Sequence, residues 1–464
     1  MIGVSLMKSS QPLYLSLYEN FKKQIIEGQY QANDKFPSKR QLSKHLSISH
    51  TTIEHAYQLL NDEGFIHSKP RSGFFVSDIE ALPVIHRHSN KLSENEDSNN
   101  LDNEQHRYKY SFSLAEIDSE SFPMRIFRKY AKDVYEDNQI ALLRRGKRQG
   151  EYALRQQIAH YLFNSRGVTS HPNQIIIGSS TSQLLDMITN LLKEDEFIIE
   201  DPSYPPIKQV LDKKRMKYLQ VPVEKNGIQI DPVLNSKKNV LYITPSHQFP
   251  TGYVTNLKKR TQLINWSHQE ANRYIIEDDY DSEFRYFGKP IPALQSLDTK
   301  EKVIYISTFS KSLYPSCRIA YIVLPKSLMH KFNKRKYKEG NTVPVHIQHM
   351  VARFMASGSF ERHLNKMRKI YRNKLNYILS RLNKYNKQIQ IDGALTGMHF
   401  TLTVINGLTL NQCMENAKKN NLKLEIYNYE DDLQKYPKFI LGFGGIKQSE
   451  LENHVNALIE TLIK

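Results

Sequence analysis

The chain has 464 residues, 39% of them hydrophobic, which is enough for two or more folded domains and argues against an extensively disordered protein. Its formal net charge of +17 favours acidic partners such as nucleic acid or phosphorylated ligands, although a solvated basic surface would carry the same charge. Two cysteines, no signal-peptide pattern and no long apolar run exclude a disulfide framework, a cysteine-built metal site and a membrane span, so we expect a soluble protein of the reducing cytoplasm.

Residues 1–79 have the pattern of a small helical domain. Apolar residues recur at helical spacing over residues 13–27, and Gly28 supplies a stop signal. Ser38 can cap a second helix, and a short turn at residues 47–49 leads into a third helix that ends at Gly64. The apolar face of this third helix consists of Ile53, Ala56, Tyr57 and Leu60. Two helices joined by so short a turn match the dimensions of a helix-turn-helix.

The opposite face of the third helix begins with polar residues that can hydrogen-bond base edges or phosphates. Two short strands are expected at residues 65–66 and 74–76, with a basic wing, residues 69–73, between them. The candidate DNA contacts from this pattern are His50, Thr51, Thr52, Lys69, Arg71 and Gly73. A small helical domain for protein contacts is the alternative, and the nearly neutral charge of this segment does not decide between the two.

Residues 80–108 change character, since residues 93–100 are almost devoid of apolar groups. We expect a flexible linker here. Its length of about 29 residues would let the N-terminal domain reach a partner subunit. The predicted organisation is therefore a DNA-binding domain at 1–79, a linker at 80–108 and a larger domain at 109–464.

The larger domain alternates short apolar runs with helical segments. The runs are residues 175–177, 197–199, 240–243, 274–276 and 303–306, and residues 318–324 add another strand. Long helices are expected over residues 344–382, followed by a smaller C-terminal α+β subdomain. The fold class is α/β, with a mostly parallel sheet and flanking helices.

Polar residues follow several of these strands, where open α/β sheets place their ligands. Lys311 follows one strand at the position expected of a Schiff-base lysine, and Asp278 and Tyr280 follow another, where they could meet a pyridine ring nitrogen and ring oxygen. The candidate phosphate contacts are Thr181, Ser182, Ser307, Thr308, Ser310 and Arg318. The combination predicts a pyridoxal 5'-phosphate site. Taken singly, each motif also fits a lysine in a polar turn, an acidic strand end or an ordinary capped helix.

The chain resembles the fold-type I pyridoxal phosphate aminotransferases. More closely, it resembles the MocR-type transcriptional regulators, which join a GntR-like winged helix-turn-helix to an aminotransferase-like domain. The motifs that carry the resemblance are residues 36–40 (FPSKR), 49–52 (SHTT), 244–252 (TPSHQFPTG), 277–284 (EDDYDSEF) and 307–311 (STFSK). It covers nearly the whole chain apart from about residues 80–108.

The resemblance implies further site residues. Arg40 would contact DNA. Ser38, in the motif at residues 36–40, and Ser49, in the motif at residues 49–52, are further candidate DNA contacts. Tyr204 would stack on the cofactor ring. The family also implies a head-to-tail homodimer with the cofactor site at the subunit interface.

Three single positions and one segment depart from the family pattern. Ile440 stands where aminotransferases carry the arginine that binds the substrate carboxylate, and Phe249 replaces the asparagine of their Asn-Pro-Thr-Gly motif. Residues 142–148 lack the tyrosine that often reaches the phosphate from a neighbouring subunit, and His50 replaces an arginine common in GntR-like domains. The first two departures weigh against transamination.

We therefore interpret the chain as a DNA-binding transcriptional regulator whose aminotransferase-like domain senses pyridoxal phosphate or an amine that reacts with it, and not as an enzyme. The alternative is an active aminotransferase with an appended DNA-binding domain. A third possibility, a dimerisation domain without cofactor, is disfavoured by the intact set of Asp278, Tyr280, Lys311 and Arg318. The expected partners are a duplex operator, a small effector and a second copy of the chain, with no metal and no membrane.

Overall fold

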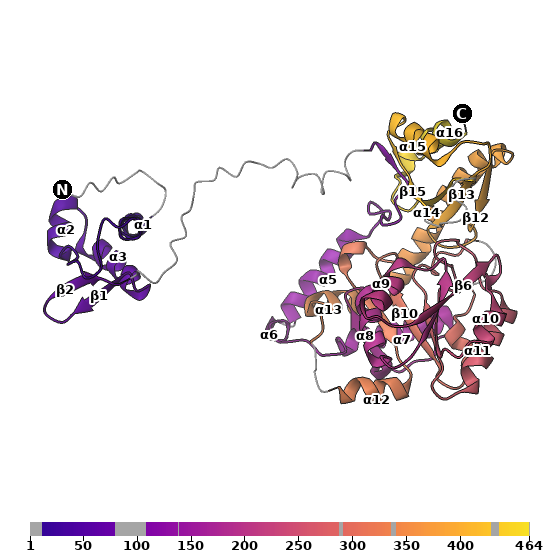
Figure 1. Cartoon of the computed structure of the whole chain (residues 1–464), viewed down its shortest axis with the longest axis horizontal. Coiled ribbons are helices and arrows are strands. Elements are labelled where there is room, and N and C mark those ends of the chain that lie inside the picture. The colour runs from indigo at the N-terminus through magenta and orange to yellow at the C-terminus, as the bar shows by residue number, and fades with distance from the viewer. Residues whose placement is uncertain are drawn as a thin grey trace. The chain divides into compact units, whose positions relative to one another are not determined.

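A computed structural model describes residues 12–78, 108–137, 139–286, 291–335, 340–427 and 436–463. The chain divides into two compact units, Met1–Leu101 and Asp102–Lys464 (Figure 1), each with its own hydrophobic core. The predicted linker lies outside the described residues, except for its last residue.

The first unit consists of three helices and a β-hairpin, namely α1 (Leu13–Ile26), α2 (Lys39–Leu46), α3 (His50–Asp62), β1 (Ile66–Lys69) and β2 (Gly73–Val76). Hydroxyl groups cap two of the helices, because the Ser38 side chain accepts the backbone N–H of Gln41 and the Ser49 side chain accepts that of Thr52. The predicted apolar face of α3 is buried in the core, against α1. This is the winged helix-turn-helix that the sequence predicts.

The second unit is built on an eight-stranded sheet with the order β4-β11-β10-β9-β8-β5-β6-β7. The strands are β4 (Ile175–Gly178), β5 (Phe197–Asp201), β6 (Tyr218–Glu224), β7 (Gly227–Ile228), β8 (Val240–Ile243), β9 (Tyr274–Asp278), β10 (Val303–Thr308) and β11 (Ala320–Val323). From β10 to β6 the neighbouring strands are parallel, whereas β11 and β7 run antiparallel to theirs. The sheet is thus mostly parallel, as predicted.

Two details of the sheet differ from the prediction. Strand β6 was not predicted, because its burial pattern is mixed and it contains Pro222, and a proline normally argues against a strand. The strand expected from residue 318 begins at Ala320, since Arg318 has a φ of 48°, which is left-handed and not extended.

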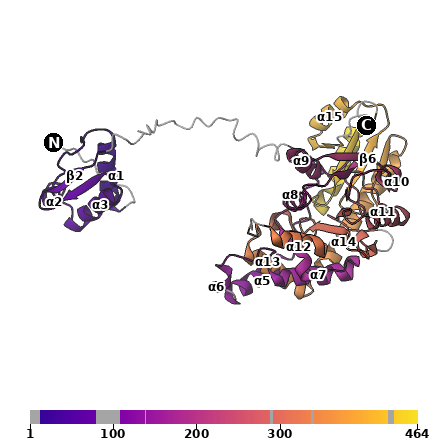
Figure 2. The ribbon, with the colours of Figure 1, turned by 60° about the horizontal axis from the view of Figure 1, so that its bottom comes forward.

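Helices cover both faces of the sheet, and successive strand residues pack on opposite faces. Ile276 packs with residues of α8 and α9, whereas its neighbour Ile275 packs with residues of α11. The helices are α5 (Met124–Asp137), α6 (Gln139–Leu142), α7 (Tyr152–Arg166), α8 (Thr181–Leu191), α9 (Pro205–Lys213), α10 (Ile230–Leu234), α11 (Leu257–Gln269), α12 (Lys326–Lys334), α13 (Val345–Ala356) and α14 (Ser359–Leu382). Figure 2 shows α5, α7 and α13 side by side on one side of this unit.

The chain ends in a smaller α+β subdomain. Its sheet has the order β12-β13-β16-β15, formed by β12 (Ile389–Asp392), β13 (His399–Val404), β15 (Glu425–Ile426) and β16 (Lys438–Gly442), with helices α15 (Leu410–Lys419) and α16 (Leu451–Leu462). Strand β14 (Leu422–Lys423) pairs with β3 (Tyr110–Ser111), so the beginning of the second unit is tied to its end. Among the described residues, no helix is long and apolar enough to cross a membrane.

Candidate functional site

A cavity of about 580 Å³ opens at the carboxyl ends of the central strands. It is lined by nine of the ten residues that the sequence predicts as cofactor contacts: Thr181, Ser182, Tyr204, Asp278, Tyr280, Thr308, Ser310, Lys311 and Arg318. Parallel strands end at the same edge of a sheet, and this topology brings the residues after β4, β5, β9 and β10 together.

Lys311 lies in the turn that follows β10, and its ammonium group donates a hydrogen bond to the backbone carbonyl of Leu114. Burial lowers the pKa of the Lys311 ammonium below its usual value, while the carboxylates of Asp281 and Glu425 act in the opposite direction. A lowered pKa favours the neutral amine, which is the nucleophilic form.

Asp278 ends β9 and is 2% exposed. The Tyr242 hydroxyl donates to its Oδ2 at 2.8 Å, whereas Oδ1 has no hydrogen-bond partner among the described residues. Burial raises the pKa of this carboxyl group to about 7. A buried carboxylate with one unsatisfied oxygen at a cavity wall fits a protonated pyridine nitrogen, which would supply both the missing hydrogen bond and a positive charge.

The opposite end of the cavity suits a phosphate group. Helix α8 begins at Thr181 and is capped by Ser180, and Ser180, Thr181 and Ser182 line the cavity, so the start of this helix borders the site. Thr308 and Ser310 share a hydrogen bond of 3.0 Å between their hydroxyls, and Arg318 lies exposed at the cavity wall. Ser307 is not part of the lining, because its hydroxyl is buried and donates to the backbone carbonyl of Asp279 at 2.6 Å.

Aromatic rings form much of the remaining wall. The Tyr204 and Phe249 rings meet edge to face with centroids 5.5 Å apart, and Phe249 also lies near Tyr280 and His399. The lining residues that the sequence did not single out are Leu114, Ala115, Ser180, Asp281, Met398 and His399. Asp281 belongs to a quoted motif. Ser180 directly precedes the predicted contact Thr181. Leu114, Ala115, Met398 and His399 come from segments far apart in sequence, and only the pairing of β3 with β14 and the position of β13 could have revealed them.

Ile440 and the basic residues of the segment at 142–148, where the chain departs from the aminotransferase pattern, lie outside the cavity lining. Ile440 is 6% exposed in β16, opposite Thr401 and Glu425, and lies outside the cavity lining. None of Arg144, Arg145, Lys147 and Arg148 lines the cavity within the described part of the chain. Arg148 instead stacks on the Phe332 ring, with its guanidinium carbon 4.0 Å from the ring centroid.

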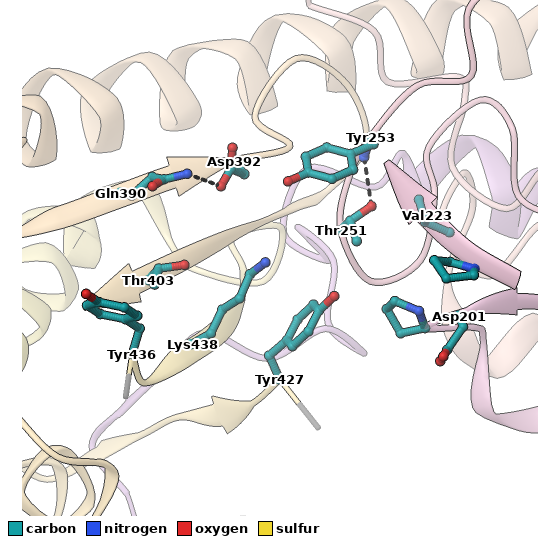
Figure 3. Close-up of a pocket in the computed structure, with 12 residues that line it drawn as sticks. Asp201, Val223, Thr251, Tyr253, Gln390, Asp392, Thr403, Tyr427, Tyr436 and Lys438 are labelled. Atoms are coloured by element: carbon teal, nitrogen blue, oxygen red, sulfur yellow. Dashed lines mark hydrogen bonds between the residues drawn. The ribbon is translucent and has the colours of Figure 1, made fainter. Parts of the chain in front are cut away.

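A second cavity, of about 300 Å³, lies between the edge of the large sheet and the C-terminal subdomain (Figure 3). Its walls include Asp201 and Val223 from the large sheet, the loop with Thr251 and Tyr253, and Asp392 of β12. The loop at residues 249–253 therefore has a cavity on each side, with Phe249 facing the first and Tyr253 the second.

The predicted DNA contacts lie on the surface of the first unit. Ser38, Arg40, Ser49, His50, Thr51, Lys69, Arg71 and Gly73 are exposed, and Thr52 is half-buried. The two serines cap the helices on either side of the turn, and the two basic residues lie at the tip of the β-hairpin. Arg71 and Gly73 have φ values of 59° and 107°, which form the tight wing turn.

Comparisons with known proteins agree with both halves of this architecture. Residues 13–76 match the family of bacterial regulatory proteins, gntR family, and residues 118–421 match aminotransferase class I and II. The chain is 36% identical over 452 residues to the uncharacterized HTH-type transcriptional regulator YdeL of Bacillus subtilis, covering 96% of both chains. It is also 29% identical to the probable rhizopine catabolism regulatory protein MocR of Rhizobium meliloti, covering 78% of this chain and 75% of that protein. The chain belongs to the MocR-type transcriptional regulators.

Two further comparisons bear on this MocR-type chain. The pyridoxine biosynthesis transcriptional regulator PdxR of Corynebacterium glutamicum is 27% identical to it, covering 82% of this chain and 81% of the relative. Among solved structures, the kynurenine aminotransferase of Pyrococcus horikoshii matches with a TM-score of 0.67 and 22% identity, covering 83% of this chain and 98% of that one. The second likeness shows the fold alone. The relatives are transcription regulators, which supports regulation over catalysis as the main function.

Proposed function

We propose that this MocR-type regulator binds pyridoxal phosphate in the cavity around Lys311 and that occupancy of this site changes its affinity for a duplex operator in the cytoplasm. The observation that carries the proposal is the unsatisfied Oδ1 of buried Asp278, which shares one cavity with a lysine, an arginine and a helix N-terminus. No single member of this set is specific to one ligand. Together they match the ring nitrogen, the aldehyde and the phosphate of one cofactor.

When bound, pyridoxal phosphate supplies an aldehyde that reacts with amines and an electron-withdrawing ring. Lys311 would hold the aldehyde carbon through its side-chain nitrogen, and Asp278 would hold the proton on the ring nitrogen. Tyr280 would donate to the ring oxygen, and Tyr204 would stack on the ring. The first turn of α8, with Thr308, Ser310 and Arg318, would hold the phosphate.

We propose that pyridoxal phosphate itself is the signal. Tight binding of an amino acid requires a cation for its carboxylate, because burying an unpaired carboxylate costs several kcal/mol. Among the described lining residues the cations are Lys311 and Arg318, and both are needed by the cofactor. Burial lowers the pKa of His399 to about 3, so this wall residue is neutral. The name of the relative PdxR, a pyridoxine biosynthesis regulator, supports the same idea.

The same absence of a free cation among the described lining residues argues against an aminotransferase as the main function, since transamination needs a held amino acid carboxylate.

We further propose a head-to-tail homodimer whose DNA-binding domains lie at residues 1–79 and are joined through the linker at residues 80–108. A dimer would read two half-sites, whose spacing reflects the separation of the two winged modules.

The test is a titration of pyridoxal phosphate, and then of a panel of amino acids and amines, into the full-length protein bound to duplex from the region upstream of its own gene. We expect pyridoxal phosphate alone to change operator affinity, and Lys311→Ala to abolish both this response and the visible absorption that borohydride removes from the parent protein. The control Lys326→Ala, at the exposed start of α12, should keep both. Arg40→Ala should weaken operator binding by about 1 to 3 kcal/mol with the cofactor spectrum unchanged.

Different results would overturn separate parts of the proposal. A protein that stays colourless with pyridoxal phosphate has no such site, and a dimerisation domain becomes the better interpretation. An amino acid that changes operator affinity where pyridoxal phosphate alone does not would make that amino acid the signal. Turnover of an amino donor and an oxo acid would establish the aminotransferase.

A further inference from the structure

A buried histidine–aspartate pair lies directly behind Tyr280. The side chains of His247 and Asp281 are 1% and 2% exposed, and His247 Nδ1 lies 2.9 Å from Asp281 Oδ2 and 3.0 Å from Oδ1. His247 comes from the loop after β8, and Asp281 is the residue after Tyr280 in the loop that follows β9. Nothing in the cofactor site as described above requires this pair.

The position of the proton on the imidazole follows from its partner. A carboxylate has only acceptor atoms, so the ring nitrogen that faces it carries a hydrogen, whether the imidazole is neutral or charged. This nitrogen is Nδ1. The backbone N–H of Met398 donates to Asp281 Oδ2 at 3.1 Å and holds the carboxylate from the side of the C-terminal subdomain.

The Tyr280 hydroxyl lies 3.2 Å from the same Nδ1. Because the one hydrogen on Nδ1 is already donated to Asp281, the tyrosine oxygen can at most share it, and the Tyr280 O–H cannot donate to Nδ1. The Tyr280 O–H then has no acceptor among the described residues, although the ring lies in the cavity wall. The hydroxyl proton is therefore free to be donated to a ligand in the cavity.

The imidazole is also enclosed, so it has little room to turn. A Cβ atom at Gly397 would lie 2.0 Å from His247 Nδ1, which means that the glycine backbone packs against the ring. The His399 ring covers another side with centroids 4.4 Å apart, and its Nε2 lies 3.2 Å from the carbonyl oxygen of Pro250.

We propose that the His247–Asp281 pair is a positioning device that fixes Tyr280 as a hydrogen-bond donor toward the ring oxygen of pyridoxal phosphate. The inference rests on the proposed cofactor site and deepens it. A donated hydrogen bond stabilises the negatively charged form of that ring oxygen, so the pair should lower the pKa of the lysine-bound cofactor. His247 would not touch the cofactor and would act through Tyr280.

Other charged and titratable groups face the same region and must be held constant in a test. Asp278, Asp281, Glu200 and Tyr204 act on Tyr280. Asp281 and Glu425 act on Lys311, and His399 and Arg318 line the cavity. All of these groups are unchanged in a substitution of His247, so the difference between the variant and the parent protein reports on the imidazole.

A metal site is the competing interpretation of the same residues. One ligand atom each from His247, Asp281 and His399 lies within 4.8 Å of the others, and two histidines with one carboxylate are a set that zinc or iron binds. A metal ion bound at Nδ1 of His247 would take its lone pair and remove the N–H that faces Asp281 and Tyr280. The two interpretations therefore differ in a measurable way.

The experiment is a pH titration of the visible absorption of full-length protein loaded with pyridoxal phosphate. His247→Leu should raise the apparent pKa of the bound cofactor by about one unit, a tenfold change in the proton equilibrium, in the same direction as Tyr280→Phe. In the Tyr280→Phe background, His247→Leu should add nothing. His247→Asn, whose amide can place an N–H near the position of Nδ1, should restore a value closer to the parent, whereas His247→Gln should not.

The outcomes separate the possibilities. An unchanged midpoint in His247→Leu, or an equal shift with and without Tyr280, would overturn the positioning role. Stoichiometric zinc in the purified protein that disappears in His247→Leu would establish the metal site instead. If His247→Leu fails to fold, the comparison of the Asn and Gln variants decides the question. Absence of visible absorption in the parent protein would overturn the proposed function itself.

Discussion

Burial of Asp278 makes the stability of the protein depend on pH. Burial raises the pKa of this carboxyl group from 3.8 to about 7. The folded protein therefore binds more protons than the unfolded chain between these values, and the free energy of unfolding falls as the pH rises from about 4 to about 7. In the proposed cofactor site, a protonated ring nitrogen would stabilise the charged form of this carboxyl group.

We predict that Asp278→Asn stabilises the cofactor-free protein at pH 7 to 8 by on the order of 1 to 3 kcal/mol, because the neutral amide avoids the buried charge while keeping an acceptor for Tyr242. The same variant should lose most of its affinity for pyridoxal phosphate. Urea unfolding followed by the fluorescence of Trp266, the one tryptophan of the chain and fully buried in the second unit, measures the stability.

The gain should shrink as the pH falls from 7 and vanish below the unfolded-state pKa of 3.8, where the parent carboxyl group is protonated in both states. Asp212→Asn, at a residue exposed on α9, is the matched control and should leave the unfolding curve of the second unit nearly unchanged. A variant that is less stable than the parent at every pH would show that Asp278 supports the fold and not only the ligand.

At the scale of elements, the two helices around the turn of the winged module depend on their capping serines. Ser49 accepts the backbone N–H of Thr52 and also lies 2.7 Å from the hydroxyl of this threonine. Ser49→Ala should destabilise the start of α3 by about 0.5 to 2 kcal/mol. Since the polar face at the start of α3 is the proposed DNA surface, operator affinity should fall with it.

Amide hydrogen exchange over residues 50–62 measures this effect, because Trp266 in the other unit does not report on it. Thr51→Ala is the control for stability, since Thr51 is exposed and its hydroxyl makes no hydrogen bond within the described residues. Equal exchange rates in Ser49→Ala and the parent protein would contradict the capping role.

The burial of each strand determines whether the sequence could predict it. Strands buried on both faces produce continuous apolar runs, such as residues 303–306, so the central strands and the residues that follow them were accessible. Strand β6 was not, because it is half-exposed and contains Pro222. The walls from Met398 and His399, and the pair of His247 with Asp281, depend on contacts across more than 30 residues, for which a single sequence carries no periodic signal.

At the scale of the whole molecule, one side of the second unit exposes apolar side chains that a folded protein usually covers. Ile140 of α6 is 72% exposed, the adjacent Leu143 is 88% exposed, and Phe163 of α7 is 63% exposed. Tyr135 and Met124 of α5 add two more, at 53% and 57%. In Figure 2 these three helices lie along the same side of the unit. Several exposed apolar side chains on neighbouring helices are typical of an interaction surface.

We therefore expect this surface, named here the α5–α7 face, to be the interface of the proposed homodimer. The double variant Ile140→Asp and Leu143→Asp would place two charges in the apolar contact, where burying an unpaired charge costs several kcal/mol. Sedimentation velocity at micromolar concentration with pyridoxal phosphate present should show a dimer for the parent protein and a monomer for the variant. Leu257→Asp, at a 67% exposed residue of α11, is the control and should stay dimeric.

Affinity for a duplex with two half-sites should fall in the double variant, while affinity for a single half-site should not change. A double variant that sediments as the parent does would place the interface elsewhere, and a parent protein that is monomeric under these conditions would overturn the homodimer.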